Sequence, residues 1–201
     1  MESSASNDPL TRAQRRVDFA RRLTSHRART GTIVELTGLS LNRLTALRKG
    51  WGIRKETRLR GRYPSTLDRF LETPAARTDT AAVLAVCRVL DALPEPLRDY
   101  APGGKLYFES AVRLCGAFEA YHACRPGSDL EFDDLMQLVR ELNSQGVISL
   151  GRCKTCRALV VIAKHDPLRP ICSHCQQESD THNRKGTSPK KTVNGRDRRR
   201  R

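Results

Sequence analysis

Two pairs of closely spaced cysteines constrain what this chain can fold into more than any other feature of its sequence. Cys153 and Cys156 are separated by two residues, and Cys172 and Cys175 repeat that spacing after fifteen intervening residues. A two-residue spacer lets two thiolates converge on one ion from a tight turn, and two such turns complete a tetrahedron of sulfur ligands. We therefore predict that these four cysteines bind one structural zinc ion per chain.

The same cysteine pattern leaves some choices open. Thiolate ligands suit zinc or an iron–sulfur cluster, and they disfavour magnesium and calcium. His165 and His174 lie in the same segment, and either could replace a cysteine as a ligand, although such histidines are more often surface residues. With four sulfurs bound, the ion has no open position for an activated water, so we predict no catalytic role for the metal.

The segment between the cysteine pairs has the composition of a small β-hairpin or ribbon. Residues 158–163 are rich in β-forming residues, and Asp166 and Pro167 mark a turn. A ribbon of this length buries little apolar surface by itself. We expect metal binding to supply much of its folding free energy, on the order of 10 kcal/mol in model zinc peptides.

The seven cysteines and the absence of long apolar segments bear on the cellular compartment. Residues 1–9 are polar and lack the apolar stretch of a secretory signal. The longest apolar run, 81–87, is far shorter than the roughly 18 residues that span a bilayer. We therefore expect a soluble, cytoplasmic protein with no membrane partner, whose cysteines bind metal or stay buried as thiols.

Positive charge is concentrated at the two ends of the chain, whose formal net charge is +15. Residues 1–63 contribute +10, residues 64–150 contribute −5 and residues 151–201 contribute +10. A field of this sign attracts polyanions such as nucleic acid. We predict that the basic ends face nucleic acid and that the acidic middle forms the core and a protein-partner surface. For the Arg-rich tail, a merely solvated segment fits equally well.

Residues 32–49, TIVELTGLSLNRLTALRK, have the pattern of two helices joined by a tight turn. Gly38 lies where the backbone needs a left-handed conformation, and Ser40 is placed to cap the second helix. The pattern resembles a helix-turn-helix unit, whose second helix enters the major groove of DNA. An ordinary helical hairpin has the same pattern. The predicted inner face of the second helix consists of Leu41, Leu44 and Leu47.

Polar and basic residues of this second helix and of the segment after it are candidates for contact with duplex DNA. Arginine suits the acceptors of guanine, and asparagine suits the paired donor and acceptor of adenine. Basic residues in the loop-like stretch WGIRKETRLRGRY are suited to phosphates. The predicted contacts are Asn42, Arg43, Arg48, Lys49, Arg54, Lys55, Arg58, Arg60 and Arg62.

The rest of the body is predicted to be helical, because apolar residues recur at helical spacing over 11–26, 78–93 and 105–124. A further helix is expected to open at Ser128 or Asp129 and to end near Gly146. The predicted fold class is therefore mainly α: a helical body with a helix-turn-helix-like N-terminal unit and a small C-terminal four-cysteine zinc ribbon.

The same features divide the chain into four parts. We predict a disordered N-terminus over 1–10, a helical DNA-binding and partner-binding body over 11–150, the zinc ribbon over 151–178, and a disordered basic tail over 179–201. The tail has almost no apolar residues with which to offset the entropy of ordering.

The sequence does not suggest an enzyme. It contains no nucleophile elbow, no phosphate-binding Walker loop and no metallo-hydrolase helix. Cys87, Cys115 and Cys124 fall on apolar helix faces or helix ends, where free cysteine is commonly buried and inert. Asp133 and Asp134 are interpreted as first-turn helix charges.

Three stretches together resemble a known family. They are LNRLTALRKGWG in the basic N-terminal part, FESAVRLCGAFEAY in the helical middle, and GVISLGRCKTC followed by CSHC. Over residues 10–177 this layout is similar to the FlhC family, the C subunit of the bacterial flagellar master transcriptional activator. The resemblance implies that Cys153, Cys156, Cys172 and Cys175 bind zinc. The basic N-terminal third and the Arg-rich tail depart from the family pattern.

The resemblance also implies a function. FlhC proteins act with an FlhD subunit in a heterohexamer, four D with two C. The complex binds upstream of flagellar class II promoters and assists RNA polymerase. For this chain we therefore expect a DNA-binding activator with an FlhD-type partner, at flagellar or related promoters.

Other functions fit parts of the pattern. A zinc-ribbon RNA-binding protein, or a diverged accessory regulator of non-flagellar genes, fits the charge and the cysteines. A thiol oxidoreductase would use the cysteines chemically. An interaction scaffold would use the acidic middle and leave the basic ends incidental.

Overall fold

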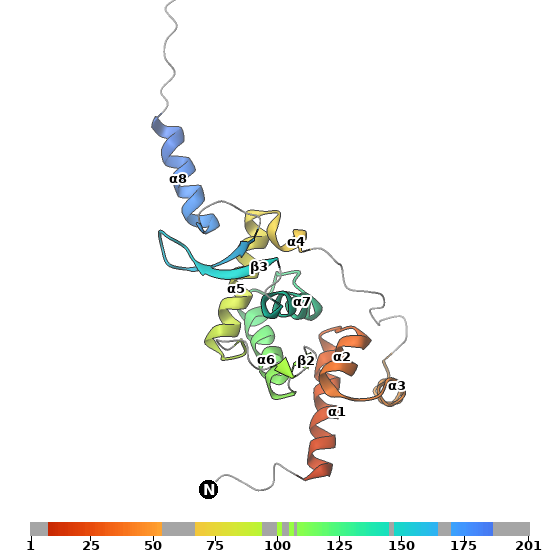
Figure 1. The fold of residues 1–201 in the computed structure, drawn as a ribbon. Coiled ribbons are helices and arrows are strands. Elements are labelled where there is room, and N and C mark those ends of the chain that lie inside the picture. Colours follow the sequence, from red (N-terminus) through yellow and green to blue (C-terminus); the bar gives the residue numbers. More distant parts are fainter. Residues whose placement is uncertain are drawn as a thin grey trace, which may run out of the picture.

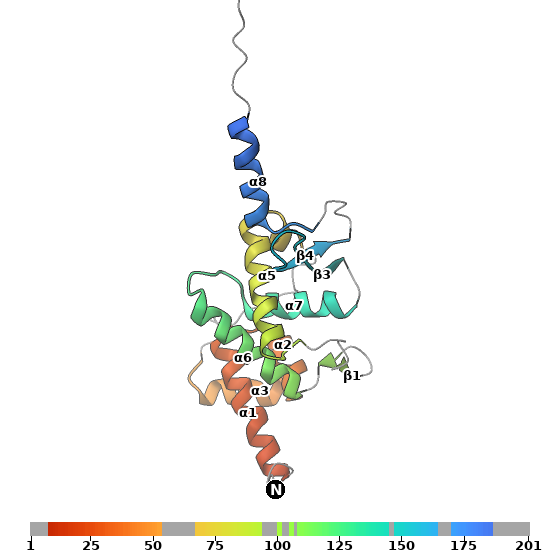
Figure 2. The same ribbon diagram turned by 90° about the vertical axis from the view of Figure 1, so that its left-hand side faces the viewer.

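The computed structural model describes residues 8–53, 67–93, 100–101, 105–106, 108–144, 147–164 and 170–186. Within these ranges the chain is mainly helical, with eight helices and two small antiparallel sheets, as the predicted fold class requires. Helices α1 to α3 lie at one end of the molecule, and a β-hairpin and the last helix lie at the other (Figures 1 and 2).

The helices are α1 Pro9–Ser25, α2 Thr30–Thr37, α3 Leu41–Gly50, α4 Asp68–Leu71, α5 Pro74–Val89, α6 Phe108–Cys124, α7 Phe132–Asn143 and α8 Ser173–Gly186. The strands are β1 Tyr100–Ala101, β2 Lys105–Leu106, β3 Ile148–Arg152 and β4 Leu159–Ala163. Strand β1 pairs with β2, and β3 pairs with β4.

Helix α1 begins earlier than predicted, so residues 9 and 10 belong to it and not to a disordered N-terminus. Asp8 caps the helix: its Oδ2 accepts a hydrogen bond from the backbone N–H of Thr11 at 2.9 Å. Pro9 occupies the first helical position, where a missing N–H costs nothing. Both signals, an aspartate cap and a proline at the first position, are present in the sequence.

The predicted helix–turn–helix between α2 and α3 is confirmed, including its turn chemistry. Gly38 has φ 67° and ψ 12°, the left-handed conformation expected of a glycine that ends a helix. Ser40 caps α3, since its Oγ accepts a hydrogen bond from the backbone N–H of Arg43 at 3.3 Å. The two helices therefore meet in a short, locally determined turn.

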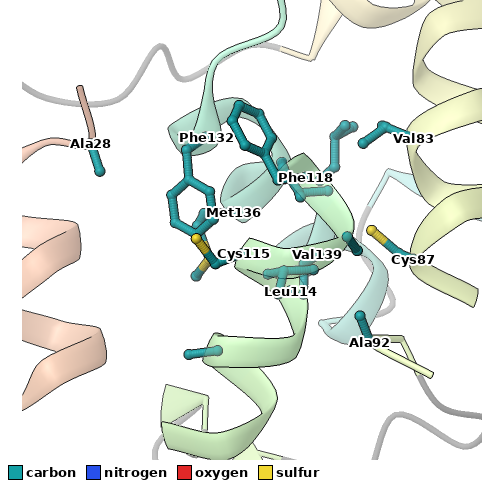
Figure 3. Packing of buried hydrophobic residues seen from close by; sticks show 14 of the residues in the cluster. Ala28, Val83, Cys87, Ala92, Leu114, Cys115, Phe118, Phe132, Met136 and Val139 are labelled. Atoms are coloured by element: carbon teal, nitrogen blue, oxygen red, sulfur yellow. The ribbon is translucent and has the colours of Figure 1, made fainter. Parts of the chain in front are cut away.

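One hydrophobic core joins this N-terminal unit to helices α4 to α7 and to the β3–β4 hairpin. Leu23 of α1, Ile33 of α2 and Leu44 of α3 are fully buried in it. In the same core, Phe118 of α6 meets Phe132 of α7 edge to face, with ring centroids 5.5 Å apart (Figure 3). The helix-turn-helix is thus part of the body and not a separately tethered module.

Helix α7 begins at Phe132, with Glu131 as its cap, and not at the predicted Ser128 or Asp129. The backbone N–H of Glu131 donates to Asp134 Oδ2 at 2.9 Å, which completes a reciprocal capping box. Helix α6 also begins later than predicted, at Phe108, because Lys105 and Leu106 form strand β2. The predicted boundary at 150/151 falls inside β3, since the hairpin starts within the supposed body.

A buried carboxylate of α7 caps the start of α2. Helix α2 has no cap from its own side chains. Instead, Asp133 accepts the backbone N–H of Arg29 at 2.8 Å and the hydroxyl of Thr32 at 2.5 Å. Asp133 is only 2% exposed. Its position in the sequence indicates a first-turn charge of α7, whereas the side chain also accepts hydrogen bonds from α2 and the residue before it. Its negative charge lies where the α2 dipole is positive, and it fixes α2 against α7.

The carboxylate of Glu119 on α6 holds α1 in a similar way. The guanidinium of Arg22 donates to both carboxylate oxygens, at 2.6 and 2.5 Å, and His26 Nε2 lies 2.6 Å from Oε1. The hydrogen bond from Arg22 is the main reason that the pKa of Glu119 falls to about 2. Arg140 of α7 adds a contact at 2.5 Å to Glu35 of α2.

The hairpin of β3 and β4 links the helical core to the apolar cluster around the cysteines. Its strands pair in antiparallel register from 148 opposite 163 to 152 opposite 159. Side chains of β4 alternate between its faces: Leu159 and Val161 pack against the helical core, whereas Val160 and Ile162 pack with the cysteines. One strand therefore serves two apolar clusters.

Within the described residues, no helix combines the length and the apolar character that crossing a bilayer requires.

Replacing Asp133 with alanine is expected to lower the free energy of unfolding by about 2–4 kcal/mol, because a backbone N–H and a hydroxyl lose their buried acceptor. Asp129→Ala removes an exposed aspartate four positions earlier and should change stability by less than about 0.5 kcal/mol. Urea denaturation compares the two variants. An Asp133→Ala protein as stable as Asp129→Ala would contradict the capping role.

Glu119→Gln should lower stability at pH 7 by about 1 kcal/mol, since the ion pair is partly exposed to solvent and is screened. The lowered pKa of Glu119 means that its stabilisation is complete above its ordinary pKa of 4.5 and is lost as the pH falls toward 2. The stability difference between wild type and variant should therefore shrink over that pH range. Thermal unfolding at several pH values measures it, and a constant difference would refute the assignment.

Candidate functional site

The four cysteines that the sequence singled out come together beside the β3–β4 hairpin. Their sulfur atoms all lie within 4.8 Å of one another, and Cys156 Sγ is 3.5 Å from Cys172 Sγ. Sulfur ligands at about 2.3 Å from one zinc ion would lie about 3.8 Å apart in a tetrahedron. The described geometry is therefore compatible with one tetrahedral metal ion held by Cys153, Cys156, Cys172 and Cys175.

Each half of the site comes from a different kind of local structure. Cys153 follows β3 directly, and its backbone N–H donates to the carbonyl of Ala158 at 2.8 Å, which closes the turn that carries Cys156. Cys172 precedes α8, and Cys175 lies in the first turn of that helix. The backbone N–H of Cys172 points at Cys153 Sγ at 3.3 Å, so the two halves already meet through a hydrogen bond.

The electrostatics of the cluster suit a cation. Backbone hydrogen bonds, first that of Cys156 and then that of Cys172, lower the pKa of Cys153 to about 6. The hydrogen bond with the Cys172 thiol, followed by burial, raises the pKa of Cys175 to about 12. Without a cation, one sulfur therefore ionises readily and its neighbour does not. A divalent ion removes that conflict, because it lets all four sulfurs bind as thiolates.

Neither histidine is needed to complete the set of ligands. His174 is exposed and lies 3.4 Å from Glu178, one turn further along α8. His165 falls outside the described residues. Arg152, Lys154 and Arg157, which neighbour Cys153 and Cys156 in the sequence, are exposed, and so is Lys164 at the far end of β4.

The other three cysteines lie outside the four-sulfur cluster. Burial raises the pKa of both Cys87 and Cys115 to about 12, so both remain protonated thiols. Cys124 is exposed at the end of α6, which corrects the expectation that it packs in the core. The neighbouring His122 has its Nε2 2.9 Å from the carbonyl oxygen of Leu130.

The second candidate surface is the outer face of α3. Asn42, Thr45, Ala46 and Lys49 recur at intervals of three and four residues, and all are exposed. Arg43 is also exposed, next to this face. The helix therefore presents one polar stripe wide enough to meet another molecule.

One predicted contact on α3 is wrong. Arg48 is only 3% exposed, and its guanidinium donates to Thr30 Oγ1 at 2.8 Å. It fixes α3 to α2 and cannot reach DNA from that position. Conversely Leu41, predicted on the inner face, is 56% exposed. The predicted contacts Arg54, Lys55, Arg58, Arg60 and Arg62 lie outside the described residues.

The ribbon continues further than predicted. Helix α8 runs to Gly186, so the expected disordered tail from residue 179 begins inside a helix. The helix projects away from the body (Figures 1 and 2). Its polar composition gives no apolar spacing from which the helix could be predicted.

Comparison of the chain with protein-family models and with curated proteins found no match.

The purified full-length chain is expected to contain one metal ion, and Cys153→Ser or Cys175→Ser should abolish its binding at submicromolar zinc, because a four-sulfur site loses a ligand. Cys124→Ser, outside the cluster, should leave the metal content unchanged. Elemental analysis with thiol counting tests this. Full occupancy in both cluster variants would exclude the site.

Proposed function

We propose that this chain is a cytoplasmic DNA-binding regulator of transcription in which α3 enters the major groove and zinc has a structural role. One observation carries the proposal: a helix-turn-helix whose second helix is buried on one side and exposes a polar stripe on the other. Leu44 and Arg48 hold the buried side. Asn42 and Lys49 lie on the exposed side.

The chemistry of that stripe suits base edges and phosphates. An asparagine can bind adenine through two hydrogen bonds, and an arginine can bind guanine in the same way. Thr45 and Ala46 lie between Asn42 and Lys49, and small apolar groups there suit the methyl group of thymine. The basic charge of the N-terminal third supports attraction to phosphate.

The proposed zinc ribbon lies at the opposite end of the molecule from α3 (Figure 1), and its properties also favour a DNA-binding function. With four sulfur ligands the ion has no free position for water, which favours structure over catalysis. The exposed basic residues around it offer further contacts for a polyanion. Since α3 and the ribbon are far apart in the fold, substitutions can test their contributions separately.

The finer proposal rests on the sequence resemblance to the FlhC family. In it, the chain acts with an FlhD-type subunit, four D with two C, and the complex assists RNA polymerase at flagellar or related promoters. The acidic middle of the chain supplies the surface for that partner. Co-purification of the tagged chain from its native cell, with native mass measurement of the complex, tests this. Recovery of the chain alone would refute the proposed FlhD-type partner, but it would not contradict the proposal that α3 binds DNA.

Arg43→Ala is expected to weaken binding to a selected duplex by about 1–3 kcal/mol, or roughly five- to 150-fold in Kd. The duplex is first selected from a random pool by the zinc-loaded chain with its co-purified partners. Arg113→Ala removes an equal charge from an exposed position on α6 and should change Kd less than twofold. Fluorescence anisotropy at fixed salt gives both values.

The same assay, repeated with structured RNA as competitor, distinguishes the rival function. Duplex DNA should compete at least tenfold better than RNA of equal length. Preferential binding of RNA, or equal losses in both arginine variants, would overturn the proposal that α3 reads DNA.

A further inference from the structure

The four sulfur ligands of the cysteine cluster differ in how far solvent can reach them. Cys153 is 0% and Cys175 is 5% exposed, and both pack with Val160 of β4. Cys156, in contrast, is exposed, and Cys172 is half-buried. One edge of the cluster therefore faces solvent, whereas the other edge packs against the hairpin.

The two accessible sulfurs are also close neighbours. Cys156 Sγ lies 3.5 Å from Cys172 Sγ. A disulfide holds its sulfur atoms about 2.05 Å apart, so an approach of about 1.5 Å would join these two. Cys156 lies in the turn that follows β3, and Cys172 directly precedes α8. A bond between them would therefore join the two halves of the site.

The surroundings of Cys156 favour reaction at its sulfur. Lys154 and Arg157 lie close to it in the sequence, and both are exposed. Reactive cysteines lie in partly exposed, positively charged surroundings, and the thiolate is the reacting form. A bound divalent ion keeps a cysteine ligand deprotonated. Cys87 and Cys115, by contrast, are fully buried in the helical core. Cys156 is therefore the better placed thiol for attack on a dissolved oxidant.

We propose that Cys156 and Cys172 are a peroxide-sensitive modification site, whose oxidation to a disulfide releases the metal ion. The inference rests on the proposed zinc site and adds a redox response to it. The Cys156 thiolate attacks one oxygen of hydrogen peroxide, the O–O bond breaks, and the sulfur becomes a sulfenic acid as hydroxide leaves. The Cys172 thiolate then attacks that sulfur, the S–O bond breaks, and a second hydroxide leaves as the S–S bond forms.

The atoms and electrons of this reaction balance. The two thiolates together lose two electrons, and the peroxide gains two. With two protons from solvent, the products are one disulfide and two water molecules.

The disulfide would remove two of the four ligands. Cys153 and Cys175 alone cannot complete a tetrahedral site, so we expect the metal to be lost. The new bond would keep the turn after β3 next to the start of α8, so the hairpin and the helix would stay linked without the ion. Reduction regenerates both thiols, and the modification is therefore reversible.

The test uses the reduced, zinc-loaded, full-length chain and one equivalent of hydrogen peroxide. A chromophoric indicator measures released zinc, and mass spectrometry of the alkylated, proteolysed chain locates the disulfide. Trypsin cuts after Lys154 and so separates Cys153 from Cys156. About one zinc ion should be released for each bond formed between Cys156 and Cys172. A reductant with added zinc should restore the metal content.

The matched control is Cys124→Ser, which removes an exposed thiol outside the cluster. This variant should release zinc at the rate of the wild type. Zinc that stays bound after peroxide treatment, or a disulfide of any other pairing, would overturn the assignment to Cys156 and Cys172. The metal content is measured before peroxide is added, and a reduced chain that binds no zinc would refute the metal site as well.

Discussion

Four sulfur atoms crowded within 4.8 Å can all be ionised only when a cation lies among them, and much of the far end of the molecule depends on that constraint. Cys153 closes the turn that follows β3, and Cys175 lies in the first turn of α8. The β3–β4 hairpin then carries the effect inward, because its alternate side chains pack against the helical core. The cysteine cluster is therefore coupled to the body through β4 and also through α8, whose Ser173 Oγ lies 2.5 Å from Thr78 Oγ1 of α5.

At the other end, carboxylates of the helical body set the position of the helix-turn-helix. Asp133 caps α2 from across the core, and Glu119 binds both Arg22 and His26. These contacts join α6 and α7 to α1 and α2, so α3 is presented from a rigid base. A rigid base would favour the proposed binding of α3 in a DNA groove, because small displacements misplace several contacts together.

The sequence predicted those parts of the structure that depend on local chemistry. Gly38 and Ser40 were found because a left-handed turn and a helix cap need particular residue types, and the four cysteines because metal ligation needs a particular spacing. Long-range partners were not found. Arg48 belongs to a basic stretch, yet its partner Thr30 lies on another helix, and Asp133 caps a helix about a hundred positions away. Strand β3 was missed because it is defined by its pairing with β4, and the extent of α8 because its polar sequence has no apolar residues at helical spacing.

The coupling of the metal site to the helical core can be measured most directly by amide hydrogen exchange, with and without a chelator that removes the metal from the folded chain. If one strand serves both clusters, loss of metal should speed exchange along β3 and β4 and also in the adjoining turns of α5 and α7. Amides of α1 and α2 should change little, since other contacts hold them. Exchange that changes only between residues 153 and 175, or nowhere, would contradict a fold in which the four sulfurs stabilise the hairpin and the body together.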